Sequence, residues 1–179
     1  LSKLIQLVYD AFSMKIQEKD LSFETSIDKK IPALVNGDSV RVAQILFNLI
    51  SNAVKFTPIK GKIILKIDFE KEDSKFHNIK ITVKDSGIGI SPDRIDAIFE
   101  PFIQVSDDTA RKYGGTGLGL TIIKKIINMM NGTIEVKSKL DIGTKFIVHL
   151  PFAKESSQPI NSDALSTTDN SELLVDKNK

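Results

Sequence analysis

The residue best placed to do chemistry is Asp85, which ends a run of alternating apolar and polar residues over 79–84. In a half-buried strand its parity directs the carboxylate toward the apolar side. A carboxylate in that position is costly unless hydrogen bonds satisfy it. Gly87 and Gly89 follow at once, and glycine lets the backbone turn sharply or approach a ligand closely. The run therefore predicts either a ligand-binding acid or a plain strand that ends in an Asp-Ser-Gly turn.

A second group of polar residues lies on an expected helix over 39–56, which Asp38 would cap. At about 100° per residue, Asn48, Asn52 and Lys55 fall within an arc of roughly 60° on the side away from the apolar face. Amide oxygens are ligands for a hard cation, and a lysine ammonium attracts an anion. The arc therefore suits a metal ion with a phosphate chain. An ordinary solvated polar face has the same pattern and is the alternative.

A third group is the glycine-rich stretch 114–120, which precedes an expected helix that includes residues 122–130. Backbone N–H groups at such a helix start can hold phosphate oxygens. The stretch is not a P-loop, since it has no Gly-Lys-Ser/Thr, and it lacks the Rossmann spacing and preceding strand. The polar residues 104–113 show no periodicity, which predicts a mobile loop. Thr144 shares the parity of the core residues in the last strand, so we expect it to face the same side as Asp85.

Other elements must position these groups. Apolar spacing predicts a first helix from residue 1 to about 19. Ser91-Pro92-Asp93 resembles the start of another helix, which residues 98–102 would end. Alternation and turn residues predict an extended stretch over 31–37 and strands over 21–27, 62–70, 79–85, 133–138 and 144–150. The second and third of these strands would form an antiparallel hairpin. Neither His77, near the hairpin turn, nor His149, expected as an exposed strand residue, is predicted to be catalytic.

Composition excludes several classes of protein. The 179 residues are 41% apolar and 27% charged with a net charge of +2, which gives no field favouring nucleic acid or anionic lipid. The absence of cysteine excludes disulfides, thiolate metal sites and cysteine catalysis, and it fits a reducing cytosol. No apolar run approaches the ~18 residues that span a bilayer, and no signal peptide opens the chain. The chain begins inside an apolar pattern at Leu1, which predicts a piece of a longer protein.

Five motifs in order resemble those of the catalytic ATP-binding domain of sensor histidine kinases, in the superfamily shared with gyrase B, Hsp90 and MutL. Residues 48–58 resemble the N box, 85–90 the first glycine box, 98–102 the F box, 114–120 the second glycine box, and 143–144 the last. The resemblance covers roughly residues 21–152. It implies the Bergerat ATP-binding fold, a two-layer α/β sandwich with a mixed sheet of about five strands covered by three helices.

The resemblance implies a role for each matching position. Asp85 would accept a hydrogen bond from the adenine amine, and Thr144 would support the base, partly through water. Asn52, with Asn48 beside it, would bind Mg²⁺, and Lys55 would contact phosphate; Asn48 and Lys55 are the residues assigned to catalysis. Further ATP contacts are expected from the glycine boxes, the F box and the lid: Gly87, Gly89, Ile90, Phe99, Phe102, Arg111, Lys112, Tyr113, Gly115, Thr116, Gly117, Leu118 and Gly119.

One position separates the reaction classes of this superfamily. Its hydrolases place a glutamate four residues before the Mg²⁺ asparagine, and here Asn48 stands there, which cannot act as a base. Phosphoryl transfer to an acceptor is therefore favoured over hydrolysis. The resemblance implies that the acceptor is a histidine on a dimerisation hairpin, in a His-Glu-Leu-like motif that this sequence lacks. We expect the chain to bind ATP as a monomer without phosphorylating itself, and the full-length protein to be a homodimer.

The resemblance also predicts a domain division. Residues 1–20 are expected to be a linker or helix remnant after the missing hairpin, 21–153 the catalytic domain, and 154–179 a polar tail. Residues 173–178 resemble the first strand of a receiver domain, although Lys177 departs from the usual second acid. The expected partner is a receiver domain in the same chain or a separate response regulator. The domain is expected to be cytoplasmic, and anchoring of the full-length protein to a membrane is compatible with this expectation. The alternatives are a related ATPase or conformational switch, and a degenerate interaction domain that binds no nucleotide.

Overall fold

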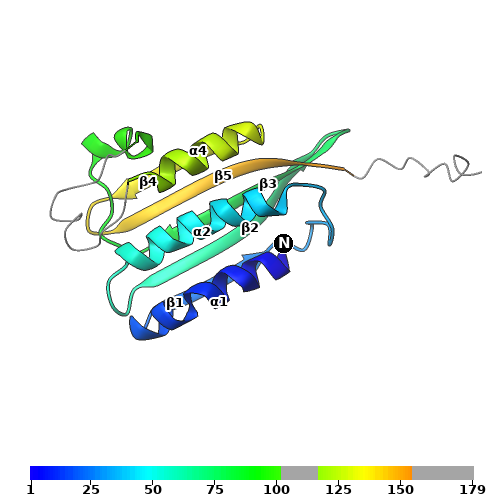
Figure 1. The fold of residues 1–179 in the computed structure, drawn as a ribbon. Coiled ribbons are helices and arrows are strands. Elements are labelled where there is room, and N and C mark those ends of the chain that lie inside the picture. Colours follow the sequence, from blue (N-terminus) through cyan, green and yellow to red (C-terminus); the bar gives the residue numbers. More distant parts are fainter. Residues whose placement is uncertain (102–116, 155–179) are drawn as a thin grey trace, which may run out of the picture.

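The computed structural model describes residues 1–101 and 117–154, which form one mixed sheet with helices packed on it (Figure 1). The strand order is β1-β2-β3-β5-β4, with β1 parallel to β2 and the other neighbours antiparallel. In chain order the elements are α1 (Ser2–Glu18), β1 (Ser22–Ile27), α2 (Ser39–Phe56), β2 (Lys62–Glu72), β3 (Phe76–Asp85), two 3-10 helices (Pro92–Arg94 and Ala97–Phe99), α4 (Gly119–Met129), β4 (Thr133–Lys139) and β5 (Gly143–Ala153). None of the helices in these ranges is long and apolar enough to cross a membrane.

Several predictions fall on residues outside the described ranges. They concern the loop over 104–113, the receiver-like stretch 173–178 and some of the expected ATP contacts, namely Phe102, Arg111, Lys112, Tyr113, Gly115 and Thr116. These assignments stay predictions.

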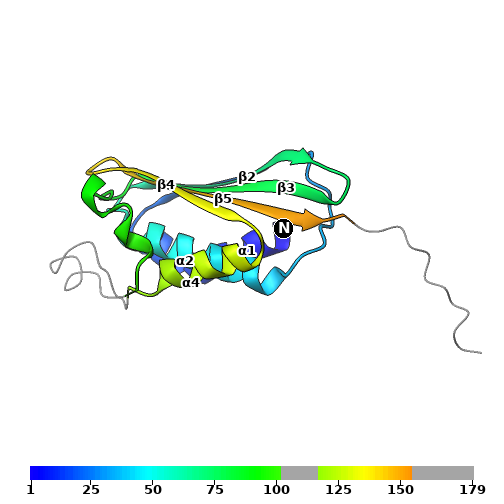
Figure 2. The same ribbon diagram turned by 90° about the horizontal axis from the view of Figure 1, so that it is seen from above.

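The α-helices of the described part of the chain, α1, α2 and α4, all cover the same face of the sheet (Figures 1 and 2). Successive side chains of a strand point to opposite faces, so alternate apolar positions meet the helices. In β2, for example, Ile63, Leu65 and Ile67 are fully buried, whereas Lys62 and Lys66 are exposed. The prediction of a two-layer α/β sandwich with a mixed five-stranded sheet covered by helices is confirmed.

The first helix belongs to the same packed unit. Ile5, Val8 and Ile16 of α1 are buried in the core that α2 shares, and the ring of Tyr9 lies 5.5 Å from that of Phe23 in β1. Full burial of one large apolar side chain contributes roughly 1.5–3 kcal/mol, so the helix adds to the stability of the domain. The predicted division into a linker or helix remnant over 1–20 and a catalytic domain over 21–153 stays a prediction, and α1 packs on the same core as that domain.

The boundaries of some elements differ from those predicted. The β2–β3 hairpin is longer, with β2 reaching Glu72 and β3 beginning at Phe76, so that its turn contains only residues 73–75. The helix expected to begin near Ser91 is replaced by the two 3-10 helices. So short a segment gives an α-helix few hydrogen bonds for the cost of its nucleation, whereas 3-10 turns form in short pieces.

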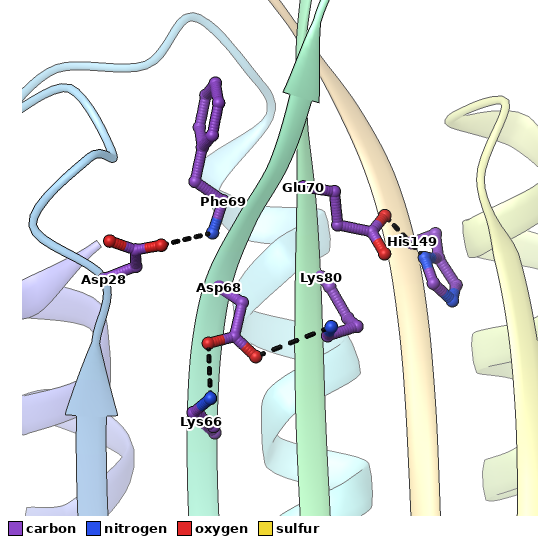
Figure 3. A network of polar contacts seen from close by, with 7 residues as sticks. All are labelled: Asp28, Lys66, Asp68, Phe69, Glu70, Lys80 and His149. Atoms are coloured by element: carbon purple, nitrogen blue, oxygen red, sulfur yellow. Dashed lines mark hydrogen bonds and ion pairs between the residues drawn. The ribbon is translucent and has the colours of Figure 1, made fainter.

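The face of the sheet without helices carries a network of paired charges (Figure 3). The carboxylate of Asp68 lies 2.7 Å from the Nζ of Lys66 and 3.7 Å from that of Lys80. Across β3, Oε2 of Glu70 lies 2.7 Å from Nδ1 of His149 on β5. The sequence predicted His149 to be exposed, but its side chain is only 30% exposed because Glu70 reaches it over the intervening strand.

Candidate functional site

The centre of the site is Asp85, at the end of β3 on the helix-covered side of the sheet. The residue is 7% exposed, and its Oδ1 accepts hydrogen bonds from the backbone N–H of Gly87, at 2.8 Å, and of Thr144, at 3.3 Å. Burial raises the pKa of this carboxyl above its ordinary value, and the two N–H donors oppose that rise in part. No residue in the described ranges donates to Oδ2. Oδ2 can therefore accept a hydrogen bond from a ligand.

Close backbone approaches shape the surroundings of Asp85. A Cβ on Gly87 would lie 2.6 Å from Oδ1 of Asp85 and 2.8 Å from the carbonyl oxygen of Phe56 in α2. Gly143, the first residue of β5, has a φ of +132°, and a Cβ there would overlap the carbonyl oxygen of Asp85. Glycine is required at both positions because real Cβ atoms do not come so close to other atoms. The backbone segments 85–87 and 143–144 therefore pack directly on each other.

A hydroxyl cluster lies beside this carboxylate. Thr144, 7% exposed, places Oγ1 2.9 Å from Oγ of Ser138, the residue opposite it on β4. The Ser138 hydroxyl also accepts from the N–H of Ile90, at 2.8 Å, and donates to the carbonyl of Gly143, at 2.9 Å. Ser138 was not among the predicted site residues. Its parity was the available signal, since it continues the inward positions of β4 after two apolar residues.

Of the polar residues of α2, Asn48 lies where this helix packs against α4. Asn48, Asn52 and Lys55 are all half-buried. Nδ2 of Asn48 donates to the carbonyl of Gln44 at 3.1 Å, and a Cβ on Gly119 would lie 2.5 Å from Oδ1 of Asn48. The amide oxygen of Asn48 thus touches the first turn of α4.

The ammonium group of Lys55 is partly buried, which changes its pKa. Burial lowers the pKa of its ammonium, and Nζ lies 4.7 Å from the centroid of the Phe56 ring. A partly desolvated ammonium interacts more strongly with an anion than one in bulk water. Lys55 is therefore suited to hold a phosphate oxygen.

The predicted residues fall into two groups. Asp85, Gly87 and Thr144 are joined by direct hydrogen bonds, and the Ser138 hydroxyl connects Thr144 with the first glycine box. Asn48 and Gly119 form the second group. The N–H of Ile88 donates to the carbonyl of Phe56 at 3.3 Å, which ties the first glycine box to the end of α2.

The remaining described candidates lie around these groups. Ile90 is buried, Gly89 and Gly117 have a φ of +70°, and Leu118 is the N-cap of α4. Nζ of Lys124 on α4 lies 5.0 Å from the centroid of the Phe99 ring. His77 lies at the opposite end of β3 from Asp85, and His149 lies on the open face, so neither histidine belongs to the site.

A lysine that the sequence analysis did not select holds the end of α2. Nζ of Lys19, which follows α1, donates to the carbonyl oxygens of Val54, Lys55 and Thr57 at 2.8, 3.1 and 2.7 Å. The last carbonyls of a helix have no partner within it, and a cation there also interacts favourably with the helix dipole. Burial lowers the pKa of this ammonium. The contact spans 35 to 38 residues, so no local pattern predicts it.

We expect Lys19→Met to lower the free energy of unfolding by about 2 kcal/mol, since it leaves half-buried carbonyl groups without a donor. Urea denaturation followed by circular dichroism measures the change. Lys15→Met, at an exposed position in the last turn of α1, is the matched control and should be nearly neutral. Equal midpoints for the two variants would show that the Lys19 contacts contribute nothing.

Together these groups define what the site can bind. The free oxygen of Asp85 and the hydroxyl of Thr144 offer hydrogen-bond acceptors to a flat group with an amine. The amide oxygens of Asn48 and Asn52 suit a hard cation, and Lys55 with the N-terminus of α4 suits an anion such as a phosphate chain. Glycines at 87 and 119 leave room where side chains would intrude.

Comparison with known proteins identifies the family of this chain. Residues 37–154 match the family described as histidine kinase-, DNA gyrase B- and HSP90-like ATPase. This chain belongs to that family. It is 43% identical over 139 residues to hybrid signal transduction histidine kinase B of Dictyostelium discoideum, covering 78% of this chain and 7% of that protein. It is also 43% identical over 150 residues to the autoinducer 2 sensor kinase/phosphatase LuxQ of Vibrio vulnificus, covering 81% of this chain and 17% of that protein.

Two solved structures with a fold similar to that of this chain are those of ShkA and of the ThkA catalytic domain. Full-length ShkA in complex with AMPPNP matches with a TM-score of 0.71 and 31% identity, over 87% of this chain and 30% of that one. The catalytic domain of histidine kinase ThkA matches with a TM-score of 0.68 and 31% identity, over 84% of this chain and 93% of that one. The chain spans a small part of its curated relatives but nearly all of the isolated ThkA domain.

Proposed function

We propose that this chain binds Mg-ATP and donates the γ-phosphate to a histidine on a separate dimerisation hairpin, as part of two-component phosphorelay signalling. The observation that carries the proposal is the buried carboxylate of Asp85, whose Oδ1 is held by two backbone N–H groups while Oδ2 has no donor in the described ranges. An acceptor fixed in this way matches the exocyclic amine of adenine. Guanine has a carbonyl oxygen at that position, and an acceptor repels it.

Residues of α2 and the start of α4 would hold the metal and the phosphates. Asn52 and Asn48 would supply amide oxygens to Mg²⁺, and Lys55 and the backbone at Gly119 would hold phosphate oxygens. Magnesium, when bound, neutralises charge on the phosphate chain. The contact between Asn48 and Gly119 supports this assignment, since it brings the amide oxygen to the helix start that would face the phosphates.

The residue at position 48 favours transfer over hydrolysis. An asparagine amide cannot deprotonate water, and Nδ2 of Asn48 is already engaged with the carbonyl of Gln44. Phosphoryl transfer needs mainly positioning and charge neutralisation, both of which this site offers. A relative named as a hybrid signal transduction histidine kinase, and the solved complex of histidine kinase ThkA with response regulator protein TrrA, support a receiver domain in the same protein or a response regulator in trans as the partner.

The test is a transfer assay. The chain is mixed with Mg-ATP labelled in the γ-phosphate and with a separately produced histidine-bearing hairpin from its parent protein. We expect acid-labile label on the hairpin and none on the chain itself. Release of phosphate to water at the same rate without the hairpin would favour an ATPase, and absence of ATP binding would favour an interaction domain.

We expect Asn52→Ala to reduce transfer by roughly a hundredfold, since loss of a metal ligand misplaces the phosphate chain. Binding of an ATP analogue should lose most of its dependence on Mg²⁺, which a titration at varied Mg²⁺ measures. Ser51→Ala, the exposed neighbour on α2, is the control. An unchanged metal dependence in Asn52→Ala would contradict the assignment of Asn52.

A further inference from the structure

The Ser138 hydroxyl has an unusually complete set of partners. It has one proton and two lone pairs, and three groups lie within hydrogen-bond distance of its oxygen. They are the N–H of Ile90, at 2.8 Å, the carbonyl oxygen of Gly143, at 2.9 Å, and Oγ1 of Thr144, at 2.9 Å. An N–H can only donate and a carbonyl oxygen can only accept. Only the direction of the bond to Thr144 is therefore left to determine.

That direction follows from counting protons. If Ser138 donates to Gly143, its lone pairs accept from Ile90 and from the hydroxyl of Thr144, and all three contacts are favourable. If Ser138 donated to Thr144 instead, its oxygen would face the carbonyl oxygen of Gly143 at 2.9 Å with no proton between them. Such a contact between lone pairs in a half-buried site is unfavourable. The proton of Thr144 therefore points to Ser138.

This bond fixes what Thr144 offers to a ligand. With its only proton committed to Ser138, Oγ1 of Thr144 has only lone pairs to offer, and its backbone N–H is already bound to Asp85. The side chains of Asp85 and Thr144, the two polar groups discussed at this end of the site, are then both acceptors. A ligand edge that carries a carbonyl would meet only acceptors there.

We propose that Ser138 is a positioning residue that makes Thr144 an acceptor and thereby sets the preference of the pocket for a purine with an amine at C6 over one with a carbonyl at C6. The proposal rests on the nucleotide function proposed above. Ser138 itself acts through Thr144 and lies on β4, one of the two edge strands of the sheet. Without its hydroxyl, the proton of Thr144 would be free to turn toward the ligand.

The first test compares non-hydrolysable analogues of ATP and GTP by calorimetric titration. In Ser138→Ala we expect the ratio of ATP to GTP affinity to fall roughly tenfold, the effect of about one hydrogen bond. Ser138→Thr keeps the hydroxyl and should keep the ratio, and Ser26→Ala, at an exposed position on β1, is the control. Equal losses for both nucleotides in Ser138→Ala, or a lowered ratio in Ser138→Thr, would overturn the proposal.

The second test needs no nucleotide. Neutron diffraction from the deuterated, ligand-free protein should show the hydroxyl deuteron of Thr144 on the line to Oγ of Ser138, and that of Ser138 directed at Gly143. A deuteron of Ser138 directed at Thr144 would overturn the proposal, even if Ser138→Ala failed to fold. If the wild-type chain bound neither nucleotide, the proposed function would fail, while the deuteron positions would still decide the direction of this bond.

Discussion

Asp85→Asn is expected to weaken binding of ATP by roughly a hundredfold or more while leaving the fold intact. The substitution is nearly isosteric, and the amide oxygen can keep both hydrogen bonds from Gly87 and Thr144. The amide nitrogen then takes the place of Oδ2 and offers a proton where the adenine amine also offers one. The loss of affinity therefore has two causes: a charge-assisted hydrogen bond is missing, and the new amide N–H faces the N–H of the adenine amine.

Calorimetric titration with an ATP analogue measures this change. Asp68→Asn is the matched control, because Asp68 is a partly buried aspartate on the opposite face whose loss breaks only the ion pairs with Lys66 and Lys80. Its affinity for ATP should equal that of the wild type. An affinity retained in Asp85→Asn would refute the adenine assignment.

The same variant should be more stable than the wild type at neutral pH. Burial raises the folded-state pKa of Asp85 above its ordinary value of 3.8, so the folded state is penalised as the pH rises through that raised pKa. Asparagine has no charge to bury. The advantage of Asp85→Asn in urea denaturation should therefore shrink at pH values below 3.8, where the wild-type carboxyl is protonated in both states.

The second large effect is expected for Gly143→Ala, with a loss of about 3 kcal/mol in the free energy of unfolding. Its φ of +132° is rarely adopted by residues with a side chain, and the new Cβ would overlap the carbonyl oxygen of Asp85. Relief of the overlap would move β5 away from β3 and lengthen the bond from Thr144 to Asp85. Stability and nucleotide affinity should therefore fall together.

Urea denaturation measures the change, with Gly119→Ala as the control. Gly119 lies in the first turn of α4 with an ordinary φ, and its added Cβ would meet only the end of the Asn48 side chain. We expect less than about 1 kcal/mol of change in its stability, since alanine is favoured over glycine in helices. A Gly143→Ala variant as stable as the wild type would show that the close packing at residue 143 is not required.

The polar residues of the site could be predicted from the sequence wherever the short-range periodicity of a strand or helix determines the direction of the side chain. Parity alone placed Asp85 and Thr144 on the helix-covered side of the sheet, because strand side chains alternate regardless of what they pack against. Capping by Asp38 and the spacing of Asn48, Asn52 and Lys55 were equally local, and the structure shows the cap at Arg41 N–H. The order of the five motifs along the sequence allowed the family to be predicted as well.

What could not be predicted depends on contacts between distant parts of the chain. Lys19 meets the end of α2 only once α1 has packed, and the direction of the Ser138 hydroxyl bond depends on the approach of the glycine box to β4. The partial burial of His149 by Glu70 needs three strands in register. Local patterns show that a residue faces inward but not which residue it meets there.

The most direct test of the central claim is calorimetric titration of this chain with an ATP analogue, with and without Mg²⁺. We expect a single site per chain that binds more tightly in the presence of Mg²⁺ than in its absence. Heat changes no larger than those of dilution, under both conditions, would contradict the claim that this domain is a nucleotide-binding phosphoryl donor.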